Sequence, residues 1–182
     1  MMERDGTLVT GGAGFVGSSV ADSLLRDGEK VIVADNFSRA GVRQNAAWLT
    51  RTHGARVRVV DVDVRDAECV RRLVAEAKQV FHFAAQVAVT TSLDDPADDL
   101  QPNVIGTFNV LETARAMRNP PPVLFTRTDK VYGGMDEVAV ELVDDAYRYA
   151  DGRRGVDETQ PLDFPLPLRL QQARRRPVRC TR

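Results

Sequence analysis

Short apolar runs alternate with segments of helical periodicity over the first two thirds of the chain. The apolar runs predict five strands, at residues 7–10, 30–34, 57–60, 79–83 and 123–126. Between them, apolar side chains recur three or four positions apart, which predicts helices at residues 15–26, 42–53, 67–77 and 98–118. The regular pattern stops near residue 133. The segment 134–164 is acidic and irregular, with weak helical character at 138–143.

Strands that are apolar on both faces, each followed by a helix, are typical of a parallel sheet covered on two sides. The pattern therefore predicts a doubly wound α/β domain over residues 1–133. Residues 134–164 are expected to form a surface insertion or loop, and residues 165–182 a separate basic tail.

The charge is unevenly distributed along the 182 residues, although the net charge is only −1. Residues 165–182 contain no acidic residue, and the rest of the chain is acidic. The six basic residues of the tail are all arginines: Arg169, Arg174, Arg175, Arg176, Arg179 and Arg182.

Several classes of protein are disfavoured by the sequence. It contains no apolar run of about 18 residues, the length a membrane span needs, and its first residues lack the apolar stretch of a signal peptide. Cys69 and Cys180 lie far apart and form no metal-binding or redox pattern. These features predict a cytoplasmic protein with free thiols, no metal and no membrane contact.

A glycine-rich turn, Gly11-Gly12-Ala13-Gly14-Phe15-Val16-Gly17, joins the first predicted strand to the first helix. Gly11 permits a tight turn, Gly14 lets the main chain approach a pyrophosphate, and Gly17 lets the helix pack close to the sheet. The helix N-terminus then offers N–H groups and a positive dipole to phosphates. A tight turn without a ligand is the alternative interpretation of the glycines alone.

An acidic residue at the end of the second strand strengthens the hypothesis of a dinucleotide site. Asp35 is positioned to accept hydrogen bonds from adenosine ribose hydroxyls and to repel a 2′-phosphate, which favours NAD over NADP. Arg39 is an argument against this preference, because an arginine just past that strand can accept the phosphate.

Four further motifs follow in order: Asp63-Val64-Arg65-Asp66, Phe83-Ala84-Ala85-Gln86, Asn103-Val104-Ile105-Gly106-Thr107, and residues 126–133. With these motifs, residues 7–164 resemble the extended short-chain dehydrogenase/reductases that modify nucleotide sugars. Asn36-Phe37-Ser38-Arg39 and residues 84–92 resemble most closely the CDP-tyvelose (CDP-paratose) 2-epimerases within that family. A related 4-epimerase, dehydratase or decarboxylase shares most of these motifs.

The resemblance implies a role for individual residues. Asp63 and Val64 are expected near the adenine, residues 84–86 near the pyrophosphate and nicotinamide, and Thr128 at the sugar hydroxyl that is oxidised. Asn103 is expected to brace the active-site helix; ordinary polar packing is the alternative for Asn103 and Thr128. The full set expected to bind NAD is Gly11, Gly14, Phe15, Val16, Gly17, Asp35, Asn36, Ser38, Arg39, Asp63, Val64, Phe83, Ala84, Ala85, Gln86 and Asn103.

The family's chemistry requires more than the cofactor. A tyrosinate takes the proton of the sugar hydroxyl, and a lysine one helical turn later lowers the pKa of that tyrosine. No Tyr-x-x-x-Lys occurs in this sequence, whose only lysines are Lys30, Lys78 and Lys130. The resemblance further implies a nucleotide-sugar substrate and a homodimer built through the helix that carries this motif.

A shift of reading frame explains the missing motif and the arginine-rich tail together. If the codons from Pro165 to Gln172 are read one base later, the genetic code permits His-Ser-Pro-Tyr-Gly-Cys-Ser-Lys, the family's catalytic segment at its expected place. We interpret this as a one-base insertion between Phe164 and Pro165, which predicts a chain without turnover. A natural divergent tail is the alternative to the frame shift, and a non-catalytic nucleotide-binding module is the alternative to an enzyme. The arginines could also form a nucleic-acid arm. The frame shift explains them without such a role, so no nucleic-acid partner is expected.

Overall fold

The computed structural model describes residues 4–86, 96–126 and 129–163. The chain divides into two compact units, residues 1–126 and 127–182, and each is described by itself. No helix among the described residues is long and apolar enough to cross a membrane.

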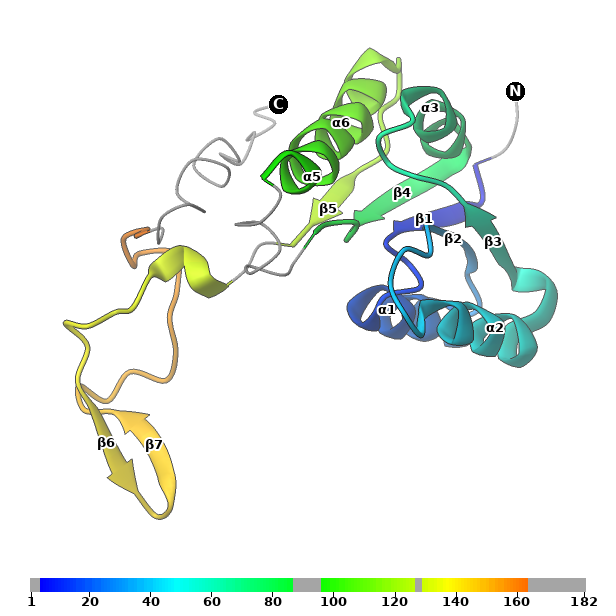
Figure 1. Ribbon diagram of the computed structural model, residues 1–182. Coiled ribbons are helices and arrows are strands. Elements are labelled where there is room, and N and C mark those ends of the chain that lie inside the picture. The colour runs from blue at the N-terminus through cyan, green and yellow to red at the C-terminus, as the bar shows by residue number, and fades with distance from the viewer. Residues whose placement is uncertain (1–3, 87–95, 127–128, 164–182) are drawn as a thin grey trace. The chain divides into compact units, whose positions relative to one another are not determined.

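A five-stranded parallel sheet forms the centre of the first unit (Figure 1). Its strand order is β3-β2-β1-β4-β5, and every neighbouring pair is parallel. The strands are β1 Gly6–Thr10, β2 Lys30–Asp35, β3 Val57–Asp61, β4 Ala77–His82 and β5 Val123–Phe125. The order reverses at β1, so the chain forms the predicted doubly wound α/β fold, which leaves a crevice at the carboxyl end of that strand.

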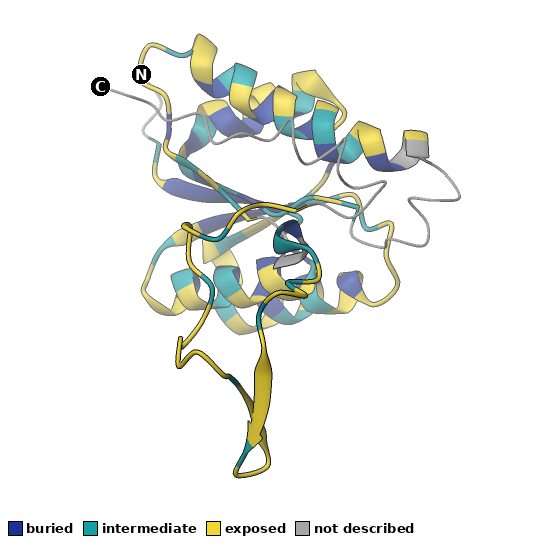
Figure 2. Cartoon of the chain, turned by 90° about the vertical axis from the view of Figure 1, so that its left-hand side faces the viewer, coloured by how far each residue is buried: buried dark blue, intermediate teal, exposed yellow. Residues whose placement is uncertain are grey.

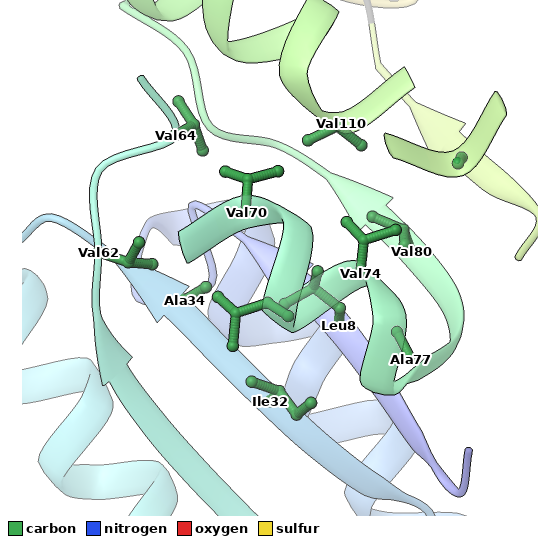
Figure 3. Close-up of a cluster of buried hydrophobic side chains, with 12 residues drawn as sticks. Leu8, Ile32, Ala34, Val62, Val64, Val70, Val74, Ala77, Val80 and Val110 are labelled. Atoms are coloured by element: carbon green, nitrogen blue, oxygen red, sulfur yellow. The ribbon is translucent and has the colours of Figure 1, made fainter. Parts of the chain in front are cut away.

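Helices cover both faces of this sheet. Helices α1, Phe15–Arg26, and α2, Val42–His53, lie on one face, and α3, Ala67–Glu76, and α6, Thr107–Ala116, lie on the other (Figures 1 and 2). A short 3-10 turn, η1 Gly54–Arg56, joins α2 to β3. Successive strand residues alternate between two apolar clusters: Leu8 packs on the α3 and α6 side (Figure 3), and Val9 packs on the α1 and α2 side. The central strands β1 and β2 are mostly buried, whereas the edge strands β3 and β5 are partly exposed, so the loops at the carboxyl edge start from the packed centre of the sheet.

The helix predicted at 98–118 is interrupted. The structure has a short helix α5, Pro96–Leu100, a π-helical segment η2, Gln101–Gly106, and then α6. Pro102 supplies the physical reason, because proline has no N–H to donate and its ring clashes with the preceding turn. The prediction of one continuous α-helix was wrong at this segment.

The second unit contains a hairpin where the sequence suggested weak helical character. Strands β6, Val140–Val143, and β7, Ala146–Tyr149, pair antiparallel after a short 3-10 turn, η3 Asp129–Tyr132. The cross-strand pairs Val140–Tyr149 and Leu142–Tyr147 place apolar and aromatic side chains opposite each other, which favours strand over helix. The helical interpretation of 138–143 was wrong. The division at residue 133 stays a prediction, and the tail 165–182 lies outside the described residues.

Candidate functional site

A cavity of about 630 Å³ lies at the carboxyl ends of β1, β2, β3 and β4, within the first unit. Its lining contains nearly every residue that was expected to bind the cofactor: Gly11, Gly14, Phe15, Val16, Gly17, Asp35, Asn36, Ser38, Arg39, Asp63, Val64, Phe83, Ala84, Ala85 and Gln86. Asn103 does not line the cavity, although it contacts Gln86. Thr128, the predicted catalytic residue, lies outside the described residues.

The glycines after β1 differ in what a side chain would meet. A Cβ at Gly17 would lie 2.2 Å from the carbonyl oxygen of Gly11, and a Cβ at Gly11 would lie 2.7 Å from the nitrogen of Ala84. Gly11 also has a φ of +64°, which disfavours any other residue. A Cβ at Gly14 would meet only the Gly11 oxygen, at 3.2 Å. Gly14 therefore keeps the main chain open toward the cavity rather than relieving a severe clash.

The first turn of α1 has the features of an anion site. Gly14 is the N-cap residue, no side chain caps the helix, and no acidic residue lies in the first turn. The first N–H groups of a helix have no acceptor within the helix and carry the positive end of its dipole. Phe15 and Val16, at this helix end, are 87% and 49% exposed. The residues present thus fit a pyrophosphate held by main-chain amides.

Asp35 organises the loop at the end of β2. One carboxylate oxygen accepts the N–H of Ala13 at 3.1 Å, and the other accepts the N–H of Phe37 at 3.0 Å. Phe37 has a φ of +53°, and the guanidinium of Arg43 lies 4.4 Å from the centre of its ring. A carboxylate oxygen can accept more than one hydrogen bond, so Asp35 retains capacity for ligand hydroxyls at the cavity wall.

Asp63 forms a charged pair at the end of β3. Arg65 donates Nε and Nη2 to its two carboxylate oxygens at 2.9 and 2.8 Å, and the N–H of Arg65 donates at 2.9 Å. Asn36 adds a hydrogen bond at 3.2 Å. The Arg65 side chain is the main cause that lowers the pKa of Asp63 to about 2. This carboxylate therefore stays charged and fixed where the sequence suggested an adenine contact.

The loop after β4 is held from two sides. The side-chain oxygen of Asn103 accepts the N–H of Gln86 at 2.9 Å, and the side-chain nitrogen of Asn103 donates to the Gln86 carbonyl at 3.2 Å. Arg39 donates to Oε1 of Gln86 at 3.0 Å. Because Arg39 follows β2 and Gln86 follows β4, this hydrogen bond joins two walls of the cavity.

Sequence reasoning missed part of the lining: Ala34, Ala40, Gly41, Val42, Asn45, Val62, Arg65 and Pro102. Asn45 is the most informative of these, because its Nδ2 donates to the Ala13 carbonyl at 2.9 Å and supports the glycine turn. A signal for it exists in the sequence. Asn45 occupies the same helical face as Val42, Ala46 and Leu49, where a polar residue interrupts an apolar stripe.

No group of three or more potential metal ligands occurs in the part of the chain that the structure describes.

Residues 8–146 match the sequence model of the GDP-mannose 4,6 dehydratase family. The chain belongs to this family. The match covers the cavity and most of the described chain, and it confirms the predicted membership of the NAD-dependent epimerases and dehydratases.

Two curated relatives are similar to this chain over less than half of their own length. The chain is 38% identical over 162 residues to the CDP-paratose 2-epimerase of Salmonella typhi, covering 88% of this chain and 47% of that protein. It is 39% identical over 146 residues to the dTDP-glucose 4,6-dehydratase of Mycobacterium tuberculosis, covering 79% and 40%.

Solved structures of nucleotide-sugar epimerases share the fold. The UDP-glucose 4-epimerase of Thermus thermophilus, in complex with NAD, matches with a TM-score of 0.62 and 33% identity, covering 87% of this chain and 44% of that one. The chain thus spans less than half the length of the relatives it matches.

Proposed function

We propose that the cavity at the carboxyl edge of the sheet binds NAD. The observation that carries the proposal is the pairing of an uncapped helix N-terminus at Gly14 with the carboxylate of Asp35 in one cavity. The first suits a diphosphate and the second suits vicinal ribose hydroxyls. The NAD complex of the similar Thermus thermophilus epimerase supports the same assignment.

Each wall of the cavity has a part in this proposal. The main chain from Gly14 to Gly17 holds the pyrophosphate, with Phe15 and Val16 covering it. Asp35, Asn36, Ser38 and Arg39 surround the adenosine ribose. Asp63 and Val64 contact the adenine, and residues 83–86 form the wall beside the nicotinamide.

For the intact gene product we propose epimerisation of a sugar carbon, specifically carbon 2 of a CDP-sugar. Bound NAD supplies a hydride acceptor. In this proposal Thr128 hydrogen-bonds the sugar hydroxyl, and the enzyme works as a cytoplasmic homodimer. The 38% identity to the Salmonella typhi CDP-paratose 2-epimerase supports the choice of substrate. Because the 182 residues contain no Tyr-x-x-x-Lys, we propose that this polypeptide itself has no turnover.

Two alternatives rest on specific observations. The same missing motif favours a non-catalytic nucleotide-binding module. The 39% identity to the Mycobacterium tuberculosis dTDP-glucose 4,6-dehydratase favours a dehydratase or 4-epimerase relative.

Calorimetric titration of the 182-residue chain with NAD and with NADP tests the cofactor proposal. We expect saturable NAD binding, and NADP binding at least about tenfold weaker, or about 1.4 kcal/mol, because Asp35 repels the 2′-phosphate. Asp35→Asn should reduce the difference between the affinities for NAD and NADP. Asp27→Asn, an exposed carboxylate at the opposite end of α1, is the matched control and should leave both affinities unchanged. A cooperatively folded sample that gives no saturable heat with NAD would refute the proposal.

A further inference from the structure

A buried carboxyl group lies beside the NAD cavity without lining it. Asp99, in the short helix α5, is 1% exposed, and its Oδ1 accepts a hydrogen bond from Nδ2 of Asn103 at 2.8 Å. Burying a carboxylate is unfavourable unless its interactions compensate for the lost hydration. Its position therefore points to a role, and this hydrogen bond leads directly to Asn103.

The chemistry of a carboxylate determines which way the Asn103 amide faces. A carboxylate accepts hydrogen bonds and donates none, whereas an asparagine amide has one donating and one accepting end. Asp99 therefore favours the orientation in which Nδ2 of Asn103 faces it, and the two hydrogen bonds to the Gln86 main chain require the same orientation. In that orientation Oδ1 of Asn103 is left to accept the N–H of Gln86 at 2.9 Å. The second hydrogen of Nδ2 is directed to the Gln86 carbonyl at 3.2 Å.

The main chain of Asn103 is held as well, so the residue is fixed at both ends. The hydroxyl of Thr107 donates to the Asn103 carbonyl at 2.7 Å. Nε2 of His82, the last residue of β4, lies 3.0 Å from that hydroxyl. Because the Thr107 hydroxyl is already a donor, the His82 ring donates to it. The π-helical segment η2 is thereby connected to the end of β4, immediately before the loop that reaches Gln86.

We propose that Asp99 is a positioning residue that orients the Asn103 amide, so that Asn103 holds the Gln86 main chain and presents the Gln86 side chain to Arg39 across the cavity. The proposal rests on the proposed NAD site, because the affinity for NAD is what this arrangement improves. Asp99 does not line the cavity, so its effect on the cofactor passes through Asn103.

Two variants at position 99 distinguish an effect on the orientation of the Asn103 amide from the effect of removing a buried side chain. Asp99→Asn keeps the size of the side chain but can donate as well as accept, so the preference of the Asn103 amide for its observed orientation is weakened and rests on the two Gln86 hydrogen bonds alone. Asp99→Ala removes the contact entirely. Thr7→Val is the matched control, because Thr7 is a buried hydrogen-bonded side chain at the opposite end of the sheet, bonded to Glu29 and Gln79.

The measurements are hydrogen exchange of the Gln86 amide in the ligand-free 182-residue chain, by NMR, and the dissociation constant for NAD. We expect Gln86 exchange to accelerate by about fivefold in Asp99→Asn and by more in Asp99→Ala, with NAD binding weakened by about the same factor. Thr7→Val should change neither quantity.

Unchanged Gln86 exchange in a folded Asp99→Asn variant would overturn the proposal, and so would faster exchange with unchanged NAD affinity. If Asp99→Ala does not fold, Asp99→Asn decides alone. If the unsubstituted chain binds no NAD, the proposed function fails, while the exchange comparison still decides whether Asp99 orients Asn103.

Discussion

At the scale of single residues, three of the four glycines in the turn after β1 serve two different purposes. Gly11 and Gly17 lie where a Cβ would come within 3 Å of main-chain atoms, so the turn itself requires them. At Gly14 a Cβ would meet a single atom at 3.2 Å, and the backbone has ordinary extended angles. Packing alone does not require glycine there, whereas close approach of a diphosphate does.

Alanine substitutions should therefore separate folding from binding. Gly17→Ala should lower the free energy of unfolding by about 3 kcal/mol, because the main chain of the turn must shift. Gly14→Ala should lower it by less than about 1 kcal/mol while weakening NAD binding by about tenfold. Urea unfolding and calorimetric titration measure the two effects. A Gly14→Ala variant that binds NAD as the unsubstituted chain does would contradict the interpretation of Gly14.

The sequence predicted which loops surround the cavity, but not all the hydrogen bonds within it. Asp35 was identified from its place after the second strand, since its spacing from the glycine turn is a local pattern. Its two hydrogen bonds to Ala13 and Phe37 depend on how β1 and β2 align, which spacing does not encode. Asn45 acts on the Ala13 carbonyl, which is distant in sequence, so its polar position on an apolar stripe was the only local signal for it. Arg65 is different: its partner Asp63 lies two positions earlier, so this pairing was visible in the sequence and was overlooked.

At the scale of elements, periodicity predicted the first and last residues of the two helices packed on β1 and β2 correctly. It failed where the chain changes from one regular structure to another. The bounds of α1 and α2 agree because the buried residues of each helix recur three or four positions apart along its length. The segment 98–118 has helical spacing throughout, so the change to π geometry at η2 was invisible to an apolar pattern. Pro102 was the available signal, since a proline inside a helical stretch marks a break.

The hairpin of the second unit was missed because its turn lacks the usual glycine or asparagine. Asp144 and Asp145 form the two-residue connection between β6 and β7, with φ angles of +49° and +60°. Two positive φ angles are typical of a type I′ turn. The sequence Asn-Gly forms this turn readily, whereas two consecutive aspartates are unfavourable in it. The acidic pair therefore carries a local strain that one substitution can relieve.

Asp145→Gly should stabilise the hairpin by about 0.5–1 kcal/mol, because glycine adopts a positive φ without a steric penalty. The hydrogen exchange of hairpin amides should slow by about two- to fivefold accordingly. The Ala150 N–H, which donates to the Ala139 carbonyl at 2.9 Å, is one suitable probe. Asp145→Ala is the control, since it removes the same charge but keeps a Cβ. If hydrogen exchange slows equally in both variants, the stabilisation comes from the lost charge and not from the backbone conformation.

At the scale of the whole molecule, the proposed cofactor site and the groups expected to carry out catalysis fall on different parts of the chain. The cavity and all its lining residues belong to the unit of residues 1–126, which has its own sheet and two apolar clusters. The groups that the family resemblance assigns to the reaction come later, at Thr128 and at the expected Tyr-x-x-x-Lys beyond Phe164. Binding and turnover are therefore separable by experiment.

Restoring the reading frame tests this separation. Removal of one base between codons 164 and 165 should yield a longer chain with Tyr-x-x-x-Lys at codons 168–172. We expect that chain to invert carbon 2 of a CDP-sugar such as CDP-paratose, followed by NMR of the sugar, and to lose turnover when the tyrosine codon is changed to phenylalanine. The 182-residue chain should bind NAD with similar affinity but convert no substrate, because its sequence has no Tyr-x-x-x-Lys to accept the hydroxyl proton. Turnover by the 182-residue chain would refute the assignment, and an early stop codon in the restored frame would refute the insertion.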